Sequence, residues 1–243
     1  MTDHLLVTKE DGVATMTMNR PKARNALSMD MRLAMFDAVD DIEHDKSIRC
    51  VVLRGAGGHF MAGGDIKNFN EYLEMEPIER RTSFERRVHS LHAMMFALKR
   101  MEKPVIASVE GAAAGAGISF MTACDLAIGA DTSYYKFSYV GIGASPDGSG
   151  SYHLPRIVGV RKALEIAMLG DTFDAAEAHR LGLLNWMVPE ADNKPRRWAS
   201  APCKRANAII CQHQTTDVCL PREFLCPAIE SGSRRFRHLC RNR

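Results

Sequence analysis

The segments FMAGGDI at residues 60–66 and GAAAGAG at residues 111–117 decide how this chain is interpreted. Each follows an apolar run typical of a β-strand, CVVL at residues 50–53 and PVIASV at residues 104–109. Small residues at a strand end let the backbone approach a ligand closely. Two such segments can direct two backbone N–H groups at one oxygen atom. This arrangement, an oxyanion hole, is what acyl chemistry needs when a carbonyl oxygen gains negative charge.

Strand-like and helix-like segments alternate on either side of these loops, which predicts a layered α/β fold. Ser28 is a suitable N-cap for the first long helix, and Thr172 or Asp174 for the last one. Apolar residues at period two and at helical spacing mark the segments. Strands are expected at residues 5–8, 13–18, 50–53, 104–109 and 126–128, and helices at residues 29–43, 78–100, 116–124, 160–169 and 174–181.

Length and composition limit the class of protein. With 243 residues, of which 46% are hydrophobic, the chain is long enough for one large domain. No apolar run approaches the ~18 residues of a membrane span, and the N-terminus has no secretory pattern, so we expect a cytoplasmic protein without membrane contact. The seven cysteines form no CxxC pair, which speaks against a metal site. The net charge of +3 comes from a basic C-terminal region without interleaved aromatic residues, so no nucleic-acid partner is expected.

The last part of the chain has a different character. From Asp192 onward the helical periodicity fades, while Pro, Cys, Arg and Gln become frequent. We therefore expect a core at residues 1–190 and an atypical tail at residues 191–243. Our hypothesis is that this tail is not a native ending, for instance an out-of-frame translation product. Sequencing of the coding DNA tests this, because a family-like ending in another frame would support it and its absence would refute it.

Six pieces of the core occur in the order of a known family. They are MNRPKARNALS at residues 18–28, FMAGGDI at 60–66, KPVIA at 103–107 leading into GAAAGAG, CD at 124–125, SPDGSGSY at 145–152, and LPRIVG at 154–159 with a later GL at 182–183. In these pieces the chain resembles the enoyl-CoA hydratase/isomerase family, the crotonase superfamily. The resemblance implies a spiral of ββα units followed by a C-terminal helical region, which is atypical here. It also implies an acyl-CoA substrate with no cofactor beyond its CoA moiety, and a homotrimer or a hexamer built as a dimer of trimers.

The resemblance assigns the two backbone donors of the oxyanion hole to Gly64 and Ala116. The second position is usually glycine in the family, so the loop here must suit a residue with a Cβ atom. Losing one such donor typically costs about 3–4 kcal/mol of activation free energy.

A second group of positions is implied to bind CoA. Backbone groups near Ala62 and Ile66 hold the adenine end in the family. Lys22 and Arg24 are candidates for phosphate contacts, with a solvated loop as the alternative. Asp65 belongs to the same CoA-binding loop, where holding the loop or capping the next helix suits it better than chemistry.

The two glutamates that carry out hydration in this family are replaced here. Their positions hold Ser119 and Tyr139, neither of which can act as a carboxylate acid or base. Asp147 stands where several isomerases that move a double bond have their catalytic aspartate, and one carboxylate suffices for that reaction beside an oxyanion hole. The alternative for Asp147 is turn formation in Pro-Asp-Gly. Tyr139 could orient Asp147, bind substrate or only pack.

These residues predict an isomerase with Asp147 as proton shuttle, and three competing functions stay open. In the family's chlorobenzoyl-CoA dehalogenase the same aspartate is a nucleophile, and a histidine that serves hydrolysis falls at His92; otherwise His92 is an ordinary helix residue. Against this, Leu91 and Tyr139 replace ring-clamping tryptophans, and Gly64 replaces a phenylalanine. The second competing function is that of a hydratase with a displaced carboxylate, such as Glu110 or Asp125. The third is that of a non-catalytic acyl-CoA-binding protein.

Overall fold

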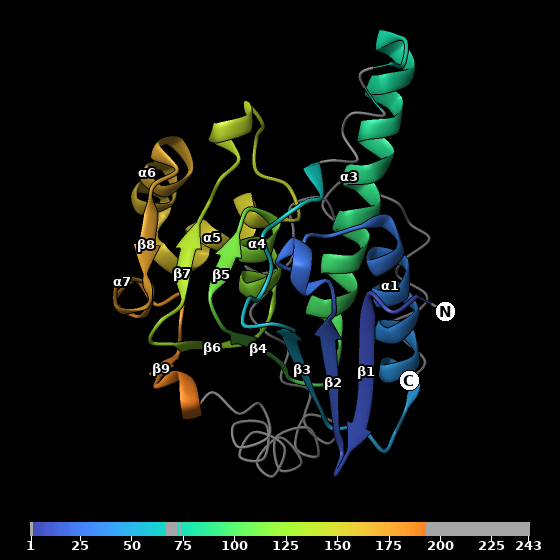
Figure 1. Cartoon of the computed structure of the whole chain (residues 1–243), viewed down its shortest axis with the longest axis vertical. Coiled ribbons are helices and arrows are strands. Elements are labelled where there is room, and N and C mark those ends of the chain that lie inside the picture. Colours follow the sequence, from blue (N-terminus) through green and yellow to red (C-terminus); the bar gives the residue numbers. More distant parts are fainter. Residues whose placement is uncertain (1, 67–71, 73, 193–243) are drawn as a thin grey trace, which may run out of the picture. The chain divides into compact units, whose positions relative to one another are not determined.

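A six-stranded sheet forms the base of the part of the chain that the computed structural model describes, namely residues 2–66, residue 72 and residues 74–192 (Figure 1). Its strand order is β1-β2-β3-β4-β6-β9, in which β1 pairs with β2 antiparallel and every later pair is parallel. The strands are β1 (Leu5–Glu10), β2 (Val13–Met18), β3 (Cys50–Gly55), β4 (Val105–Val109), β6 (Leu126–Ala130) and β9 (Trp186–Val188).

A smaller sheet of three strands continues from the large one. It contains β5 (Ala112–Ala114), β7 (Tyr134–Lys136) and β8 (Thr172–Asp174) in the order β5-β7-β8. β5 follows β4 after a short turn, and β7 follows β6 in the same way, so two successive passages of the chain contribute one strand to each sheet. This repetition of two strands and a helix is the spiral of ββα units expected from the sequence, and the α/β fold class is confirmed.

Helices cover the sheets, with α1 and α3 side by side in Figure 1 and packed on each other. The second of the predicted caps for the last helix is correct: the Asp174 side chain accepts a hydrogen bond from the Glu177 N–H at 2.8 Å. Thr172, the other candidate, lies in β8 instead. The helices are α1 (Met29–His44), α3 (Pro77–Arg100), α4 (Ala116–Ala123), α5 (Gly150–Val158), α6 (Val160–Leu169) and α7 (Ala175–Arg180), with 3-10 turns η1 (Pro21–Ala23), η3 (Val140–Ile142) and η4 (Glu190–Asp192).

The buried core lies between the large sheet and its helices. All five residues of β4 and all eight residues of α4 are buried. α1 contributes Met31, Met35, Val39 and Ile42, which are at most 2% exposed and repeat at the helical spacing of the sequence. The complete burial of α4 fixes the position of its first residue, where the second glycine-rich segment ends.

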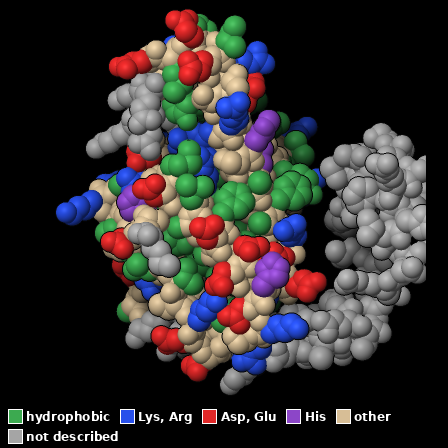
Figure 2. Space-filling view, turned by 90° about the vertical axis from the view of Figure 1, so that its right-hand side faces the viewer, with side chains coloured by type: hydrophobic (Ala, Val, Ile, Leu, Met, Phe, Trp, Pro, Cys, Tyr) green, Lys and Arg blue, Asp and Glu red, His purple; other side chains and the backbone are tan. Residues whose placement is uncertain are grey.

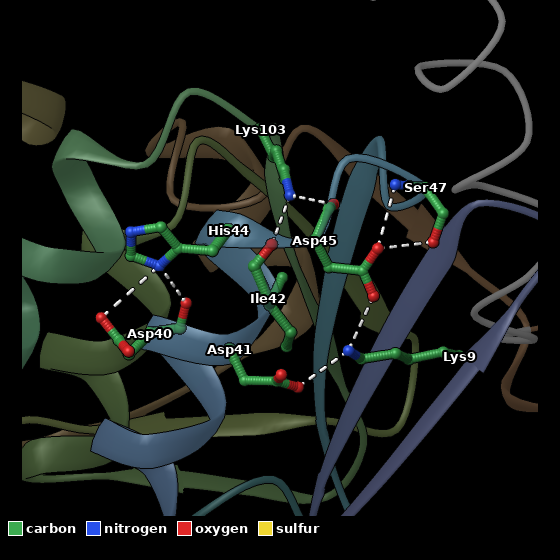
Figure 3. A network of polar contacts seen from close by, with 8 residues as sticks. All are labelled: Lys9, Asp40, Asp41, Ile42, His44, Asp45, Ser47 and Lys103. Carbon is green, nitrogen blue, oxygen red and sulfur yellow. Dashed lines mark hydrogen bonds and ion pairs between the residues drawn. The ribbon is translucent and has the colours of Figure 1, made fainter.

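Lysine side chains tie the end of α1 to its neighbours (Figure 3). Lys103, just before β4, donates to the main-chain oxygens of Ile42 and Asp45, which also accept bonds from the Asp45 and Ile48 N–H groups. Lys9 of β1 lies 2.8 Å from carboxylate oxygens of both Asp41 and Asp45. The hydrogen bond from Lys9 is the main reason that the pKa of Asp45 is held well below its usual range.

The surface over α1 and α3 carries acidic and basic side chains interspersed, with apolar side chains between them (Figure 2). Elsewhere, α6 exposes Val160, Leu164, Met168 and Leu169, each at least 49% accessible. Within the described ranges no helix is both long and apolar enough to span a bilayer. From residue 193 onward the predicted tail lies outside the described residues, so the division into a core and a tail stays a prediction.

Candidate active site

A cavity of about 810 Å³ opens where the two glycine-rich segments meet α3 and the loop before α5. The two segments contribute residues 62–64 and 66 and residues 115–116 to its wall. α3 contributes Phe84, Arg87, Val88, Leu91 and His92. Leu27 precedes α1, and Arg32 lies in its first turn. Residues 138–139 and 142–147 complete the wall. Segments far apart in the sequence therefore share one space large enough for an acyl group.

The backbone amides of Gly64 and Ala116 line this cavity, and neither donates to an acceptor within the described part of the chain. Ala116 is the first residue of α4, where an N–H has no partner inside the helix. At Gly64 the chain pairs with Leu27, but the bonds of that bridge use the Gly63 carbonyl and the Asp65 N–H. Both N–H groups are therefore available to a ligand.

The two segments approach each other so closely that a side chain at Gly63 would be crowded as well as strained. Its φ angle is +103°, and a Cβ atom there would lie 3.1 Å from the Ala114 oxygen and 3.6 Å from the Ala116 nitrogen. The positive φ of the second loop falls on Gly115, at +50°, and not on Ala116. Because the left-handed backbone conformation falls on the preceding glycine, a residue with a Cβ atom such as alanine fits at the helix start.

Asp147 reaches the cavity from the loop before α5. The Tyr139 hydroxyl donates to its Oδ1 atom at 2.6 Å, while Oδ2 has no partner in the described part of the chain. Among the described residues that line the cavity, Asp147 is the only carboxylic acid. The predicted turn is present as well, because the Gly150 N–H donates to the Asp147 carbonyl at 3.0 Å. The turn thus forms from the main chain and leaves the carboxylate at the cavity wall.

Ser119 and Tyr139, the positions of the two family glutamates, lie side by side. Their hydroxyl oxygens are 3.2 Å apart, and Ser119 also donates to the main-chain oxygen of Asp147 at 3.0 Å. Burial raises the pKa of Tyr139, and the nearby Asp147 carboxylate adds to this, so the phenol stays protonated and can donate. Sequence reasoning gave Ser119 no part in the site; its contact joins α4 to the loop that carries Asp147.

His92, Ala62 and Ile66 also lie at the cavity. His92 is half-buried on α3, and no hydrogen bond to it is found among the described residues. Ile66 is 57% exposed, so it stands at the rim of the cavity and not in its depth.

Three of the residues predicted to bind CoA are not part of the cavity wall. Asp65 is buried, and its carboxylate pairs with the Arg20 guanidinium at 2.8 Å, which fits the expected role of holding the loop. Lys22 and Arg24 are exposed on and beside η1. The Arg24 carbonyl accepts the Ala62 N–H at 2.9 Å, so this exposed pair adjoins the glycine-rich loop outside the cavity.

Arg32 is a cavity residue that sequence reasoning missed. It is only 4% exposed, and its guanidinium donates to the main-chain oxygen of Arg87 at 2.8 Å and to the Met29 sulfur. Burial, followed by the neighbouring Arg87 charge, lowers the pKa of Arg32. The signal was present in the sequence, because Arg32 lies three residues before Met35 and seven before Val39 of the apolar helix face.

A family model described as "Enoyl-CoA hydratase/isomerase" matches residues 8–215. Among curated relatives, "4-chlorobenzoyl coenzyme A dehalogenase-2" from Arthrobacter sp is 37% identical over 194 residues, which cover 79% of this chain and 69% of the relative. The "1,2-epoxyphenylacetyl-CoA isomerase" of Escherichia coli K12 is 34% identical over 188 residues, covering 77% and 70%.

Solved structures agree with this picture. A crystal structure described as an enoyl-CoA hydratase from Polaromonas sp. JS666 superposes with a TM-score of 0.75 at 34% identity. The alignment covers 84% of this chain and 77% of that one. The names of these relatives span dehalogenation, isomerisation and hydration, so similarity alone does not select one reaction.

Proposed function

Because the chain belongs to the enoyl-CoA hydratase/isomerase family, we propose that it binds an enoyl-CoA thioester and shifts its double bond, with Asp147 as proton shuttle. The observation that carries this proposal is the pairing of Asp147 with Tyr139 at 2.6 Å in a cavity where, among the described lining residues, it is the only carboxylic acid. A single base at the end of an enoyl group suits a reaction that removes one proton and returns it elsewhere.

The amides of Gly64 and Ala116 would receive the thioester oxygen. Both line the cavity and neither donates to an acceptor in the described residues, so no hydrogen bond within that part of the protein has to break when substrate binds. Negative charge develops on that oxygen when the proton leaves, and preorganised donors stabilise it without rearrangement.

The proton transfer itself would use the Oδ2 atom of Asp147. This oxygen accepts the proton from the carbon next to the thioester carbonyl, and the C–H electron pair delocalises into a dienolate. The protonated Asp147 then delivers its proton to the γ carbon, which moves the double bond into conjugation with the carbonyl and restores the carboxylate. If that proton first exchanges with solvent and returns to the carbon next to the carbonyl, the substrate is labelled there in deuterated buffer. Tyr139, held protonated, keeps Oδ1 occupied and the carboxylate oriented throughout.

Hydration fits this site less well. It requires two carboxylates around one water, and the corresponding positions carry the Ser119 and Tyr139 hydroxyls, which bond to each other and to Asp147. The exposed Lys22 and Arg24 beside the Ala62 loop are suitable partners for the phosphates of CoA.

An Asp147→Asn variant tests the proposal. With a 3-enoyl-CoA in deuterated buffer, the wild-type protein should form the 2-enoyl isomer and exchange the proton next to the carbonyl. The variant should bind a saturated thioester as tightly as the wild type and do neither. Unchanged isomerisation by the variant would remove Asp147 from the mechanism.

A second candidate function is hydrolytic dehalogenation. It is favoured by the 37% identity to the dehalogenase and by the presence of His92 and Asp147 on the walls of one cavity. In that reaction an Asp147 oxygen attacks the ring carbon that bears the halogen, and halide leaves with the C–halogen electron pair. Water, deprotonated by His92, then cleaves the aryl ester and restores Asp147.

Mass spectrometry after a single turnover with 4-chlorobenzoyl-CoA separates the two functions. A covalent aryl adduct on Asp147 together with released chloride would establish dehalogenation and overturn the isomerase proposal. The absence of both, with turnover of enoyl-CoA, would support isomerisation.

A further inference from the structure

One residue of the cavity wall is a buried arginine, Arg32, and no carboxylate of the described residues pairs with it. Arg32 lines the cavity at 4% exposure, and no carboxylate in the described part of the chain lies within ion-pair distance of it. A guanidinium has five N–H donors. The described residues supply two acceptors, the Arg87 carbonyl and the Met29 thioether, and a thioether is a weak acceptor.

This arrangement is costly for an empty or purely apolar cavity. A charge taken out of water is stabilised only when an opposite charge and hydrogen bonds replace the water. Burial is the largest cause of the lowered pKa of Arg32, and the Asp147 charge opposes it only as the smallest of four effects. A hydrocarbon chain placed against Arg32 would displace its remaining water without replacing the lost hydrogen bonds.

The place of Arg32 separates it from the groups suited to the phosphates of CoA. Lys22 and Arg24 are exposed and lie outside the cavity wall, whereas Arg32 lines the cavity together with Asp147. The cavity wall combines the apolar side chains of Phe84, Val88 and Leu91 with the positively charged Arg32. A wall of this kind suits a ligand that has an apolar middle and an anionic end.

We propose that the acyl group of the substrate ends in a carboxylate, which Arg32 binds inside the cavity. The inference rests on the proposed acyl-CoA function and adds the class of acyl group: a thioester of a dicarboxylic acid and not of a plain fatty acid. Arg32 then selects the substrate, while Asp147 performs the proton transfer.

Calorimetric titration with matched thioesters tests the inference without turnover. Glutaryl-CoA and pentanoyl-CoA have the same chain length and no double bond, and adipyl-CoA with hexanoyl-CoA repeats the comparison one carbon longer. In at least one pair the wild-type protein should bind the acid-bearing thioester about tenfold or more tightly. Arg32→Met should abolish that preference. Arg81→Met should retain it, because Arg81 is an exposed residue of α3 that pairs with Glu85 and does not line the cavity.

Each remaining outcome is equally decisive. Equal affinities within both pairs would overturn the inference and leave the proposed function standing, and this comparison needs only the wild-type protein. If neither thioester nor free CoA bound, the proposed function would fail as well. If Arg32→Met weakened free CoA as much as glutaryl-CoA, the anion bound by Arg32 would be a CoA phosphate, which also overturns the inference.

Discussion

Replacing Ala116 by proline would remove one donor of the proposed oxyanion hole while sparing the helix that carries it. Ala116 is the first residue of α4, and its N–H has no acceptor in the described part of the chain. Proline is well tolerated at a first helical position, since its missing N–H has no helical partner there and its fixed φ suits the helix. The free protein therefore loses no helical hydrogen bond.

The whole effect should fall on the charged transition state. Removing one oxyanion-hole donor typically costs about 2.7–4 kcal/mol, which corresponds to a 10²–10³-fold lower kcat. Ala116→Gly is the matched control, because it keeps the N–H, and glycine is the usual residue of the family at this position. We expect it to retain activity close to that of the wild type.

The assay follows formation of the conjugated thioester by its ultraviolet absorbance, with a saturated thioester to measure binding and thermal unfolding to verify the fold. A proline variant that folds, binds and keeps more than about a tenth of the wild-type kcat would refute the reasoning, since a tenfold loss is only ~1.4 kcal/mol. The amide of Ala116 would then not face the developing charge.

Three further perturbations address other parts of the molecule. Tyr139→Phe removes the donor to Asp147, so kcat should fall by about 10- to 100-fold while thioester affinity is unchanged; weaker binding at constant kcat would contradict this. Because Lys9 holds the pKa of Asp45 below its usual range, the Asp45 carboxylate stabilises the fold above about pH 4 and loses this effect as the pH falls toward its folded-state pKa. Asp45→Asn should thus unfold in less urea than the wild type at pH 7, with a narrower gap at about pH 3; an equal gap would refute it. Light scattering should give three or six times the mass of one chain, and Leu164→Glu on the exposed apolar face of α6 should lower it; a wild-type monomer would exclude the expected trimer.

The long elements could be predicted because burial follows the periodicity of their residues. In α1 every apolar residue of the predicted stripe is buried, and β4 is buried throughout. On α3 the apolar residues at helical spacing differ in burial. Leu91, Met95 and Leu98 are buried in the core, whereas Phe84 lines the cavity at 39% exposure. Helical spacing of apolar residues alone therefore does not show whether a side chain lies in the core or lines a binding cavity.

The short elements could not be predicted by periodicity. β5, β7, β8 and β9 have three residues each, too few to establish alternation, and their pairing comes from the tertiary fold. α5 was missed since it begins in a run of glycine and serine and contains Pro155. These elements determine where residues 138–147 meet α4, so the site was predicted as a set of residues and not as a geometry.

Within the site, several residues named from the sequence line one cavity, but the sequence did not predict how they are connected. The orientation of Asp147 by Tyr139 was one of the open possibilities, and the two side chains are in contact at 2.6 Å. The contact of Ser119 with the Asp147 carbonyl joins residues 28 positions apart and had no local signal. Arg32 was not predicted, because a charged residue beside an apolar helix stripe is usually assumed to be exposed to solvent.

The buried helix α4 has a consequence for how this protein can change. Its first residue, Ala116, carries the amide proposed to receive the thioester oxygen, and its fourth, Ser119, bonds to the loop that carries Asp147. Both groups are therefore held by one eight-residue segment without an exposed position. The part of the cavity wall that α1 and α3 build holds neither of those groups. New acyl specificities can therefore evolve, or be engineered, by exchanging side chains on that wall, while the reactive half of the pocket is inherited intact.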